Sequence, residues 1–486
     1  MRLISSMARG GGLASWLRKG TMLAGFTVLL SGCVTFSPDG GMGPVAGFIG
    51  GNLNKDVVKV SVPQDELWAR DAVGRLLKKP LTPDAAVQIA LLNNRGLQAA
   101  YNDLGIAEAV FVANSRPPAP SFSFSYVSTA LELDVERQIV ASILALVTQP
   151  ARTKIAADRF AQAQLQAGWE TLRVAAETRR AYYRAVAAQE IVAALTGFKS
   201  TAESSAELAK KLGETGALNE LDQAREQVFY ADVTTELAAA RQQATIERER
   251  LVRLLGLWGY DLDFKLPNAL PALPAKPRTL PTVEQDAMDH RVDLQIARIE
   301  VEAMARTYGL TRATRFINVL DASGISKTQK DKGSGEPHSD GGGFDVAFVV
   351  PIFDFGRPRM REAEQRYMQA VNVLAEGAIN ARSEAREAYQ TYRSSYDISG
   401  HFQHEVLPLR RTAFDQAQLQ FSSMLIDVFA LVTESRQLIT ASVNGVEAKR
   451  DFWLAHTDLG VAVLGGGGVG GKGDSFLAAK AALAGQ

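Results

Sequence analysis

The sequence is poor in the side chains that perform chemistry. Its 486 residues include one cysteine, Cys33, and five histidines. A single thiol excludes an internal disulfide framework and a cysteine-rich zinc site. The histidines are scattered without a motif, and the formal net charge of zero gives no reason to expect a nucleic-acid partner. These absences disfavour an enzyme, and we expect no cofactor and no metal site.

Proline is also missing over a long stretch, and its absence indicates long helices. None occurs between Pro150 and Pro267, and Ala, Leu, Gln, Glu and Arg dominate there. Gly213-Glu-Thr-Gly216 interrupts this stretch, which predicts helices over residues 152–213 and 218–256 joined by a turn. A similar pair is expected over 359–421 and 425–464, with a kink at Pro408.

The N-terminus lacks acidic residues and has the pattern of an export signal. A basic region ends in Arg18-Lys19, and the apolar run over residues 22–30 is too short to span a bilayer. Leu30-Ser31-Gly32-Cys33 resembles a bacterial lipobox. We therefore expect a signal peptide over 1–32, with S-diacylglycerol and an N-acyl chain on Cys33. The alternative is an ordinary signal peptide with an incidental cysteine. Val34 is not the aspartate that retains such lipoproteins in the inner membrane, which favours the outer membrane.

The rest of the chain is predicted to contain two copies of one structural repeat. Leu97-Gln98-Ala99-Ala100 recurs as Leu294-Gln295-Ile296-Ala297, each within a helix of about 32 residues that follows a Thr/Pro turn signal. The expected organisation is a flexible lipidated tether, two repeats and a Gly/Ala-rich tail, over residues 33–58, 59–270, 271–464 and 465–486.

Each repeat also contains two candidate strands. In the first they lie within about 120–148, at 121–127 and 136–148, and in the second within about 314–353, at 316–322 and 343–353. The polar, glycine-rich segment 327–343 is expected to be a solvated loop. Alternating strands of this length suit a transmembrane barrel, but four cannot close around an aqueous lumen. Because open sheet edges are not tolerated in hydrocarbon, several chains would have to share one barrel.

The order and repetition of these motifs resemble the TolC family of outer-membrane efflux proteins, in its lipoprotein branch. The resemblance covers about residues 60–462. It rests on these motifs: Leu81-Thr82-Pro83-Asp84-Ala85-Ala86, Asn93-Asn94, Arg291-Val292-Asp293-Leu294-Gln295, Glu214-Thr215-Gly216-Ala217-Leu218, Leu255-Gly256-Leu257-Trp258-Gly259 and Val350-Pro351-Ile352-Phe353-Asp354-Phe355-Gly356-Arg357.

The resemblance implies a mainly α fold with a small β part, assembled as a homotrimer. Its twelve strands would form one outer-membrane barrel, continued by a periplasmic barrel of helices. The chain would be the passive, gated exit duct for small molecules or metal ions, working with a periplasmic adaptor and an inner-membrane pump. The alternatives are a duct for type I protein secretion and a coiled-coil structural lipoprotein without a pore.

The resemblance also assigns roles to the two helical tips, at residues 212–222 and 420–427. Leu212 stands where the family has a tip arginine, and Phe421 to Ile426 stand where a glycine is usual. Asp222 and Asp427 could form a pore gate, although helix capping is the simpler interpretation of both. The expected adaptor contacts are Lys211, Gly213, Gly216, Leu218, Ser422, Ser423 and Met424.

Three smaller patterns are only weak indications of a binding site. His401 and His404 lie one helical turn apart, but no third metal ligand is evident. Residues 466–472 fit Gly-x4-Gly-Lys, but Gly473 replaces the Ser or Thr that would bind magnesium. Asp331 and His338 lie in the predicted outer loop and are expected to be solvating polar groups.

Overall fold

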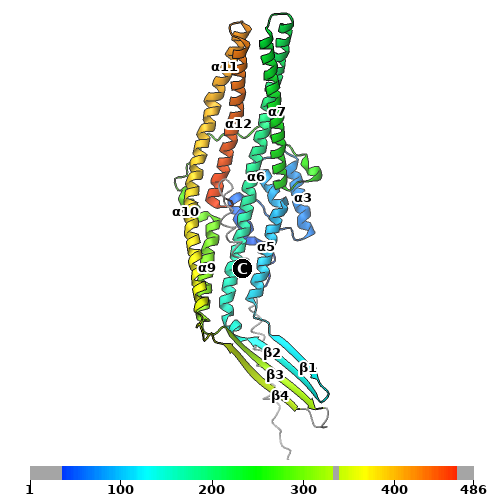
Figure 1. The fold of residues 1–486 in the computed structure, drawn as a ribbon, viewed down its shortest axis with the longest axis vertical. Helices are drawn as coiled ribbons and strands as arrows, with labels where there is room; N and C mark the ends of the chain where they lie inside the picture. The colour runs from blue at the N-terminus through cyan, green and yellow to red at the C-terminus, as the bar shows by residue number, and fades with distance from the viewer. Residues whose placement is uncertain (1–34, 332–338, 468–486) are drawn as a thin grey trace, which may run out of the picture. The chain divides into compact units, whose positions relative to one another are not determined.

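The protein consists of long helices and one small sheet, which fall into two compact units (Figure 1). The computed structural model describes residues 35–331 and 339–467. The first unit, called the sheet unit, contains residues 35–40 and 106–160 and the described part of 303–366. The second, called the helical unit, contains residues 41–105, 161–302 and 367–467. The predicted signal peptide and Cys33 lie outside the described residues.

The sheet unit is built on four antiparallel strands in the order β1-β2-β3-β4. The central pairing, β2 with β3, joins the two repeats of the sequence, and each repeat also contributes one strand at an outer edge. The strands are β1 (Ser121–Ser128), β2 (Glu132–Ser142), β3 (Val319–Asp331) and β4 (Ser339–Val349).

Three of the four strand predictions were wrong in extent: 136–148 is replaced by Glu132–Ser142, 316–322 by Val319–Asp331, and 343–353 by Ser339–Val349. The second strand of the first repeat ends at Ser142, and the next residue already begins a helix that contains Pro150 in its interior. Ser142 is also the last residue that pairs with β3, so the strand ends where its partner ends. The predicted loop 327–343 is mostly strand, because Lys327 pairs with Gly341 in register. Backbone pairing does not require apolar side chains, so the polar composition of this segment was misleading.

The remaining secondary structure is helical, and α5, α6, α9 and α10 have residues in both units. The helices are α2 (Met42–Leu53), α3 (Pro63–Leu77), α4 (Pro83–Asn93), α5 (Arg95–Ser115), α6 (Ile143–Glu214), α7 (Glu220–Leu255), α8 (Val283–His290), α9 (Val292–Ala313), α10 (Arg357–His401), α11 (Leu407–Ser422) and α12 (Val428–Leu464).

Two helical hairpins dominate the helical unit, where α6 lies beside α7 and α11 beside α12 (Figure 1). A shared apolar cluster joins them, with Leu195 on α6, Phe229 and Val233 on α7, and Val428 and Val432 on α12. Burying such side chains contributes about 1.5–3 kcal/mol each, which holds helices together that would not be stable alone. A π-helical turn at residues 402–406 interrupts the α10–α11 arm directly before Pro408, where a kink was expected.

Each opening helix is broken in two, whereas the sequence predicted one helix of about 32 residues. The breaks fall at Asn94 and Arg291, at equivalent places in the two repeats. Asn94 leaves the helical conformation and its side-chain amide donates to the carbonyl of Leu254 at 2.9 Å, near the end of α7. This contact satisfies a carbonyl that the end of a helix leaves without a partner. The break therefore allows Asn94 to cap the end of α7, a helix far away in the chain. The residues around Asn94 alone do not indicate this contact.

The segment predicted as a flexible tether is folded from its first described residues. Residues 42–53 form α2, which buries Met42, Val45 and Ile49 on one face. Further along, the backbone N–H of Val60 donates to Gln98, which donates in turn to the carbonyl of Val58. The glycines of this segment suggested flexibility, but the spacing of its three apolar residues fits one face of a helix.

Candidate functional site

The sheet has one apolar face and one polar face. On β1 the apolar face carries Phe122, Phe124 and Tyr126, and across the sheet Ile139 lies opposite Phe122. On β4 it carries Phe344, Val346 and Phe348. Phe122 is 77% exposed and Phe344 is 74% exposed. A soluble surface rarely exposes so many adjacent aromatic and aliphatic side chains, so this face must meet an apolar environment.

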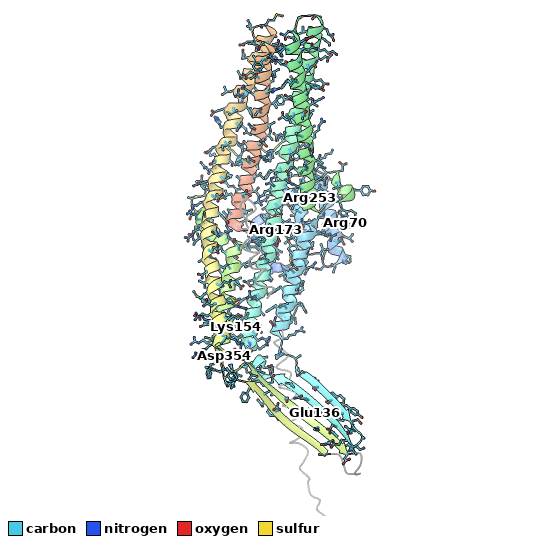
Figure 2. The ribbon with its side chains drawn as sticks, viewed as in Figure 1. Arg70, Glu136, Lys154, Arg173, Arg253 and Asp354 are labelled. Carbon is cyan, nitrogen blue, oxygen red and sulfur yellow. The ribbon has the colours of Figure 1, made fainter. Side chains whose placement is uncertain are left out.

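The opposite face carries short and charged side chains. Ser121, Ser123 and Ser125 alternate with the aromatic residues of β1, and Asp134, Glu136 and Gln138 line the same face of β2. Figure 2 labels Glu136 on the sheet. Lys327 of β3 forms a 3.6 Å ion pair with Asp134, and Gln138 donates to Ser323 at 3.1 Å. This face is therefore suited to water.

Arg137 is an exception to the two-faced pattern. It lies on the apolar face, opposite Phe124 on β1 and Ser326 on β3. On β3 and β4 the apolar residues of this face lie on the side of Arg137 nearer to the helices, and towards the other end these strands carry Thr328, Lys330 and Asp340. On β1 and β2 the apolar side continues past Arg137 with Tyr126 and Val135. Arg137 thus marks the level where the apolar band of β3 and β4 gives way to polar residues.

The edges of the sheet are open. β1 and β4 are its two outermost strands, and within the described ranges each pairs on one side only. Unpaired strand edges are templates for pairing with another chain. The sheet therefore leaves two strand edges available for pairing.

The first helical tip is a tight glycine turn between α6 and α7. Gly216 adopts a positive φ of 73°, and the N–H groups of Ala217 and Leu218 both donate to the carbonyl of Leu212, at 2.9 and 3.2 Å. Leu218 packs against the apolar cluster that joins the hairpins. Lys211 forms a 2.9 Å ion pair with Glu207, and the side chain of Gln223 lies against Gly213.

At the second tip, between α11 and α12, the backbone reverses direction although the turn contains no glycine. Met424 takes the left-handed conformation instead, with φ of 57°, and its side chain is 93% exposed. The hydroxyls of Ser422 and Ser423 both donate to the carbonyl of Leu419. The predicted tip residues thus lie at the ends of the two hairpins, with their backbones constrained by hydrogen bonds.

Of the two candidate gate carboxylates, Asp427 caps a helix and Asp222 lies in the first turn of one. The backbone N–H of Ala430 donates to Asp427 at 2.9 Å at the start of α12. Asp222 accepts a 2.7 Å hydrogen bond from the side chain of Asn219, the N-cap of α7, and pairs with Arg225 at 3.0 Å. Carboxylates at helix starts satisfy N–H groups and interact favourably with the helix dipole. The capping interpretation therefore describes Asp427, whereas α7 is capped by Asn219, whose side chain accepts from the backbone N–H of Asp222 at 2.8 Å.

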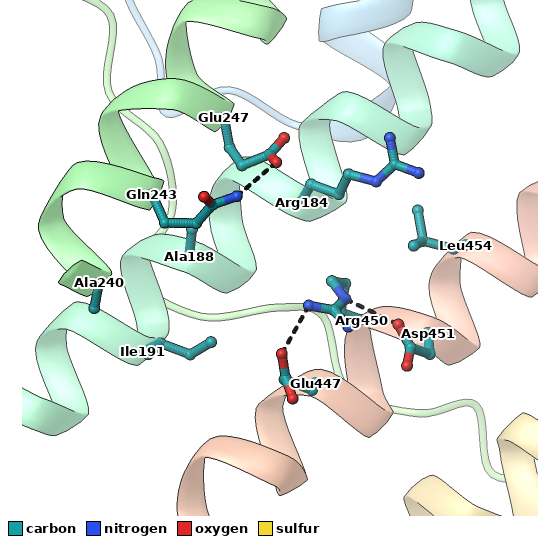
Figure 3. Close-up of a pocket in the computed structure, with 10 residues that line it drawn as sticks. All are labelled: Arg184, Ala188, Ile191, Ala240, Gln243, Glu247, Glu447, Arg450, Asp451 and Leu454. Atoms are coloured by element: carbon teal, nitrogen blue, oxygen red, sulfur yellow. Dashed lines mark hydrogen bonds and ion pairs between the residues drawn. The ribbon is translucent and has the colours of Figure 1, made fainter. Parts of the chain in front are cut away.

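A cavity of about 440 Å³ lies between α6, α7 and α12 in the helical unit (Figure 3). Charged side chains on its wall include Arg184, Glu247, Arg450 and Asp451. The sequence analysis did not identify this site, because its residues come from three helices far apart in the chain. No local motif or spacing connects them.

Among the residues that the structure describes, the remaining candidates do not form a site. Asp331 is the last residue of β3, while His338 and most of the 466–472 motif lie outside the described ranges. His401 faces Glu405 at 3.1 Å. Within residues 35–331 and 339–467, no group of three His, Cys, Asp or Glu side chains could hold a metal ion. No helix in those ranges is long and apolar enough to cross a membrane.

Comparison with known proteins identifies relatives of this architecture, although no protein-family model matches the chain. The cobalt-zinc-cadmium resistance protein CzcC of Cupriavidus metallidurans is 21% identical over 400 residues, covering 81% of this chain and 91% of CzcC.

Solved structures of outer-membrane channels share the fold. CusC superposes with a TM-score of 0.67 at 17% identity, over 82% of this chain and 92% of CusC. The Campylobacter jejuni channel CmeC gives 0.67 at 16% identity, over 85% and 91%. The open state of the Neisseria gonorrhoeae channel MtrE gives 0.62 at 16% identity, over 81% and 89%. The predicted resemblance is therefore confirmed in the fold, which is mainly helical with a small antiparallel sheet.

Proposed function

We propose that this chain, which has the fold of the outer-membrane channels CusC and CmeC, is a subunit of a passive outer-membrane efflux channel. The observation that carries the proposal is the sheet: two-faced, exposed on its apolar side, and open at both edges. An exposed apolar face is stable against lipid, and a polar face is stable against a water-filled lumen.

The open edges imply assembly. Lipid cannot satisfy unpaired backbone groups, so β1 of one copy must pair with β4 of another until the sheet closes. Four strands are too few for an aqueous lumen, whereas three copies supply twelve. The proposed unit is thus a homotrimer with a shared barrel, continued by the helices as a tunnel on the periplasmic side.

The helical tips are the proposed contacts to a periplasmic adaptor, through which an inner-membrane pump would drive transport. Met424 exposes a flexible apolar side chain, of the kind that adapts to partner surfaces. Asp222 and Asp427 would act as a gate only after their carboxylates leave Asn219 and the N–H of Ala430, so a gating role predicts that opening the tips disturbs the first turns of α7 and α12.

The proposed cargo is a small molecule or metal ion, and the chain itself performs no chemistry. The relative CzcC is named for cobalt, zinc and cadmium resistance, which supports an efflux role and leaves the cargo of this chain open. A lipid on Cys33 would add an outer-membrane anchor. An acyl chain tethers a protein to a membrane surface but forms no route through the membrane. Forming that route is the role proposed for the sheet.

The proposal is tested by the oligomeric state of the purified protein. Native mass spectrometry in a mild detergent should give three copies of the mature chain. A species that stays monomeric at micromolar concentration would contradict the shared barrel. A type I secretion duct would give the same trimer, and cargo assays with the native partners would distinguish it.

A further inference from the structure

The loop between β4 and α10 exposes large apolar side chains. Over residues 350–356, called the junction loop, Ile352 is 61% exposed, Phe353 97% and Phe355 51%. Apolar side chains this exposed, and this close together in the chain, mark a surface that meets lipid or another chain. The junction loop therefore needs an apolar partner.

The junction loop is held in this conformation by hydrogen bonds. The backbone N–H of Phe355 donates to the carbonyl of Pro351 at 2.8 Å, and Arg315 Nε donates to the carbonyl of Phe355 at 2.7 Å. Phe355 itself has a positive φ of 51°, which strains a bulky residue. A Cβ on Gly356 would lie 2.5 Å from the carbonyl oxygen of Arg315, so the loop packs closely against that residue. The exposure of its aromatic side chains is thus fixed by the fold.

Basic side chains gather near the junction loop. Residues 143–154, 306–316 and 350–361 all belong to the sheet unit and contain one acid, Asp354. Figure 2 labels Lys154 and Asp354 where the helices meet the sheet. The carboxylate of Asp354 accepts from a backbone N–H of the loop at 2.8 Å, so it is turned towards the loop backbone. The junction between the helices and the sheet is therefore strongly basic.

Three of these basic side chains already have partners in the protein. Arg306 forms an ion pair with Asp158 of α6. Arg359 donates to the side chain of Asn318, and Arg315 holds the junction loop. Within the described ranges no ion pair is found for the other five, which are Arg152, Lys154, Arg312, Arg357 and Arg361.

Arg357 and Arg361 lie at the start of α10, directly after the junction loop. Both are exposed and stand one helical turn apart on the same face. Their like charges repel, and positive charge near a helix N-terminus interacts unfavourably with the helix dipole. No acid lies in the first turn of α10 to offset this. The helix gains nothing from the pair, so an anion from outside the described chain would stabilise it.

The spacing of apolar and basic groups indicates a phospholipid as that anion. Phe353 precedes Arg357 by four residues, which span at most about 14 Å. Phe344, Val346 and Phe348 of the apolar face lead directly into the junction loop. Aromatic side chains gather at the boundary between acyl chains and headgroups, and basic side chains near it attract anionic headgroups. A soluble anion would leave the aromatic side chains uncovered.

We propose that the junction loop and the first turns of α10 bind anionic phospholipid. The lipid phosphate accepts hydrogen bonds from Arg357 and Arg361, while Phe353 lies among the acyl chains close to the headgroups. The inference rests on the proposed function, which places the sheet in the bilayer and the helices on the periplasmic side. The bound lipid then belongs to the periplasmic leaflet of the outer membrane.

Native mass spectrometry of the purified protein in a mild detergent tests the proposal, with dioleoylphosphatidylglycerol as the anionic probe. Dioleoylphosphatidylcholine is the matched lipid without net charge. We expect the wild-type protein to retain more phosphatidylglycerol than phosphatidylcholine. Arg357→Gln/Arg361→Gln should lower the retention of phosphatidylglycerol about tenfold or more, because two headgroup contacts are lost. Phe353→Ala should weaken the retention of both lipids alike, since acyl contacts do not depend on headgroup charge.

Arg241→Gln/Arg253→Gln is the matched control, since it removes the same charge from two exposed arginines of α7. It should leave the retention of phosphatidylglycerol within about twofold. The proposal is overturned by equal retention of the two lipids, by unchanged retention in the Arg357/Arg361 variant, or by equal losses in the two double variants. If the Arg357/Arg361 variant fails to assemble, Arg361→Gln alone should still lower the retention several-fold, and no loss there would also overturn the proposal.

The same spectra keep the lipid site and the proposed function separate. A trimer that shows no preference for phosphatidylglycerol refutes the lipid site and leaves the channel standing. A monomer that prefers phosphatidylglycerol through Arg357 and Arg361 refutes the shared barrel and leaves the lipid site standing.

Discussion

At the scale of single residues, the two returning helices end in the same way. Gly256 after α7 has φ of 66°, and Gly465 after α12 has φ of 88°. A Cβ on Gly256 would lie 2.6 Å from the carbonyl oxygen of Asn93, and one on Gly465 would lie 3.3 Å from the amide nitrogen of Val292. Each glycine thus lets a returning helix end against the break in its own opening helix.

Gly256→Ala is predicted to destabilise the fold more than Gly216→Ala. Both residues have positive φ, which costs an L-residue about 1–2 kcal/mol. Only Gly256 also meets backbone, since a Cβ on Gly216 has nothing within 4 Å. Thermal unfolding in detergent should show a clearly larger fall in Tm for Gly256→Ala. Equal shifts for the two variants would mean that the contact with Asn93 has no energetic role.

His456 is a buried titratable group that predicts acid sensitivity. Burial, with help from Arg278 and Arg179, lowers the pKa of His456 from 6.5 to about 4. Its Nδ1 has no hydrogen-bond partner in the described chain, and its ring lies among Tyr392, Phe452 and Trp453. The folded state therefore favours the neutral ring. Its contribution to stability is complete above pH 6.5 and declines as the pH falls from 6.5 towards 4.

His456→Phe should remove this acid-dependent loss while keeping the aromatic packing. Between pH 7 and pH 4.5 the variant is expected to lose about 2 kcal/mol less stability than the wild-type protein. Thermal unfolding across that range measures the difference, with the exposed His404→Phe as control. If both variants follow the wild-type curve, His456 is not buried as a neutral ring.

At the scale of secondary-structure elements, the two faces of the sheet predict opposite responses to charge. Phe124 is on the apolar face, and its neighbour Ser125 is on the polar face. Phe124→Lys should destabilise the assembled barrel by about 2–4 kcal/mol if it lies near the middle of the bilayer, whereas Ser125→Lys should assemble normally. The yield of heat-resistant trimer in outer-membrane fractions compares them. Equal yields would contradict the assignment of the faces.

The elements that sequence predicted well are those that a few local residues determine. Gly213 and Gly216 indicated the first hairpin turn, and Gly216 supplies the positive φ that the turn requires. Pro408 indicated an interruption in the second descending arm, because proline cannot donate the hydrogen bond that continues an α-helix. The alternation of Phe122, Phe124 and Tyr126 indicated a two-faced strand. In each case the physical cause lies within the segment itself.

The elements that sequence missed depend on partners far away in the chain. The helix break at Asn94 follows from a bond to Leu254, and the extent of β4 follows from its pairing with β3. The cavity around Glu247 is assembled from three helices, so it has no sequence signature. The folded segment at Met42–Leu53 was missed because its glycines obscured the spacing of its three buried residues.

At the scale of the whole molecule, the proposal assigns separate tasks to a lipid on Cys33 and to the sheet. Ser37, close to Cys33 in the chain, donates from its backbone to the buried carboxylate of Glu108 at 2.6 Å. This contact holds the first described residues against α5, so the segment that follows the proposed lipid anchor is folded.

Cys33→Ser is predicted to weaken sorting and membrane anchoring while leaving the fold able to form. The reason is that the strands are assigned to span the membrane and the acyl chains only to hold a surface to it. Membrane fractionation measures the first effect, and native mass spectrometry in detergent measures the second. Loss of the trimer in the Cys33→Ser protein would show that the lipid takes part in assembly.

The central claim is that three copies of this chain enclose a continuous aqueous route. Single-channel recording of the purified protein in planar lipid bilayers tests it most directly. We predict discrete conductance steps, a low open probability in the absence of partners, and no steps from a Phe124→Lys preparation that fails to assemble. A wild-type protein that is trimeric and membrane-inserted yet never conducts would contradict the claim and leave a coiled-coil structural lipoprotein as the better account.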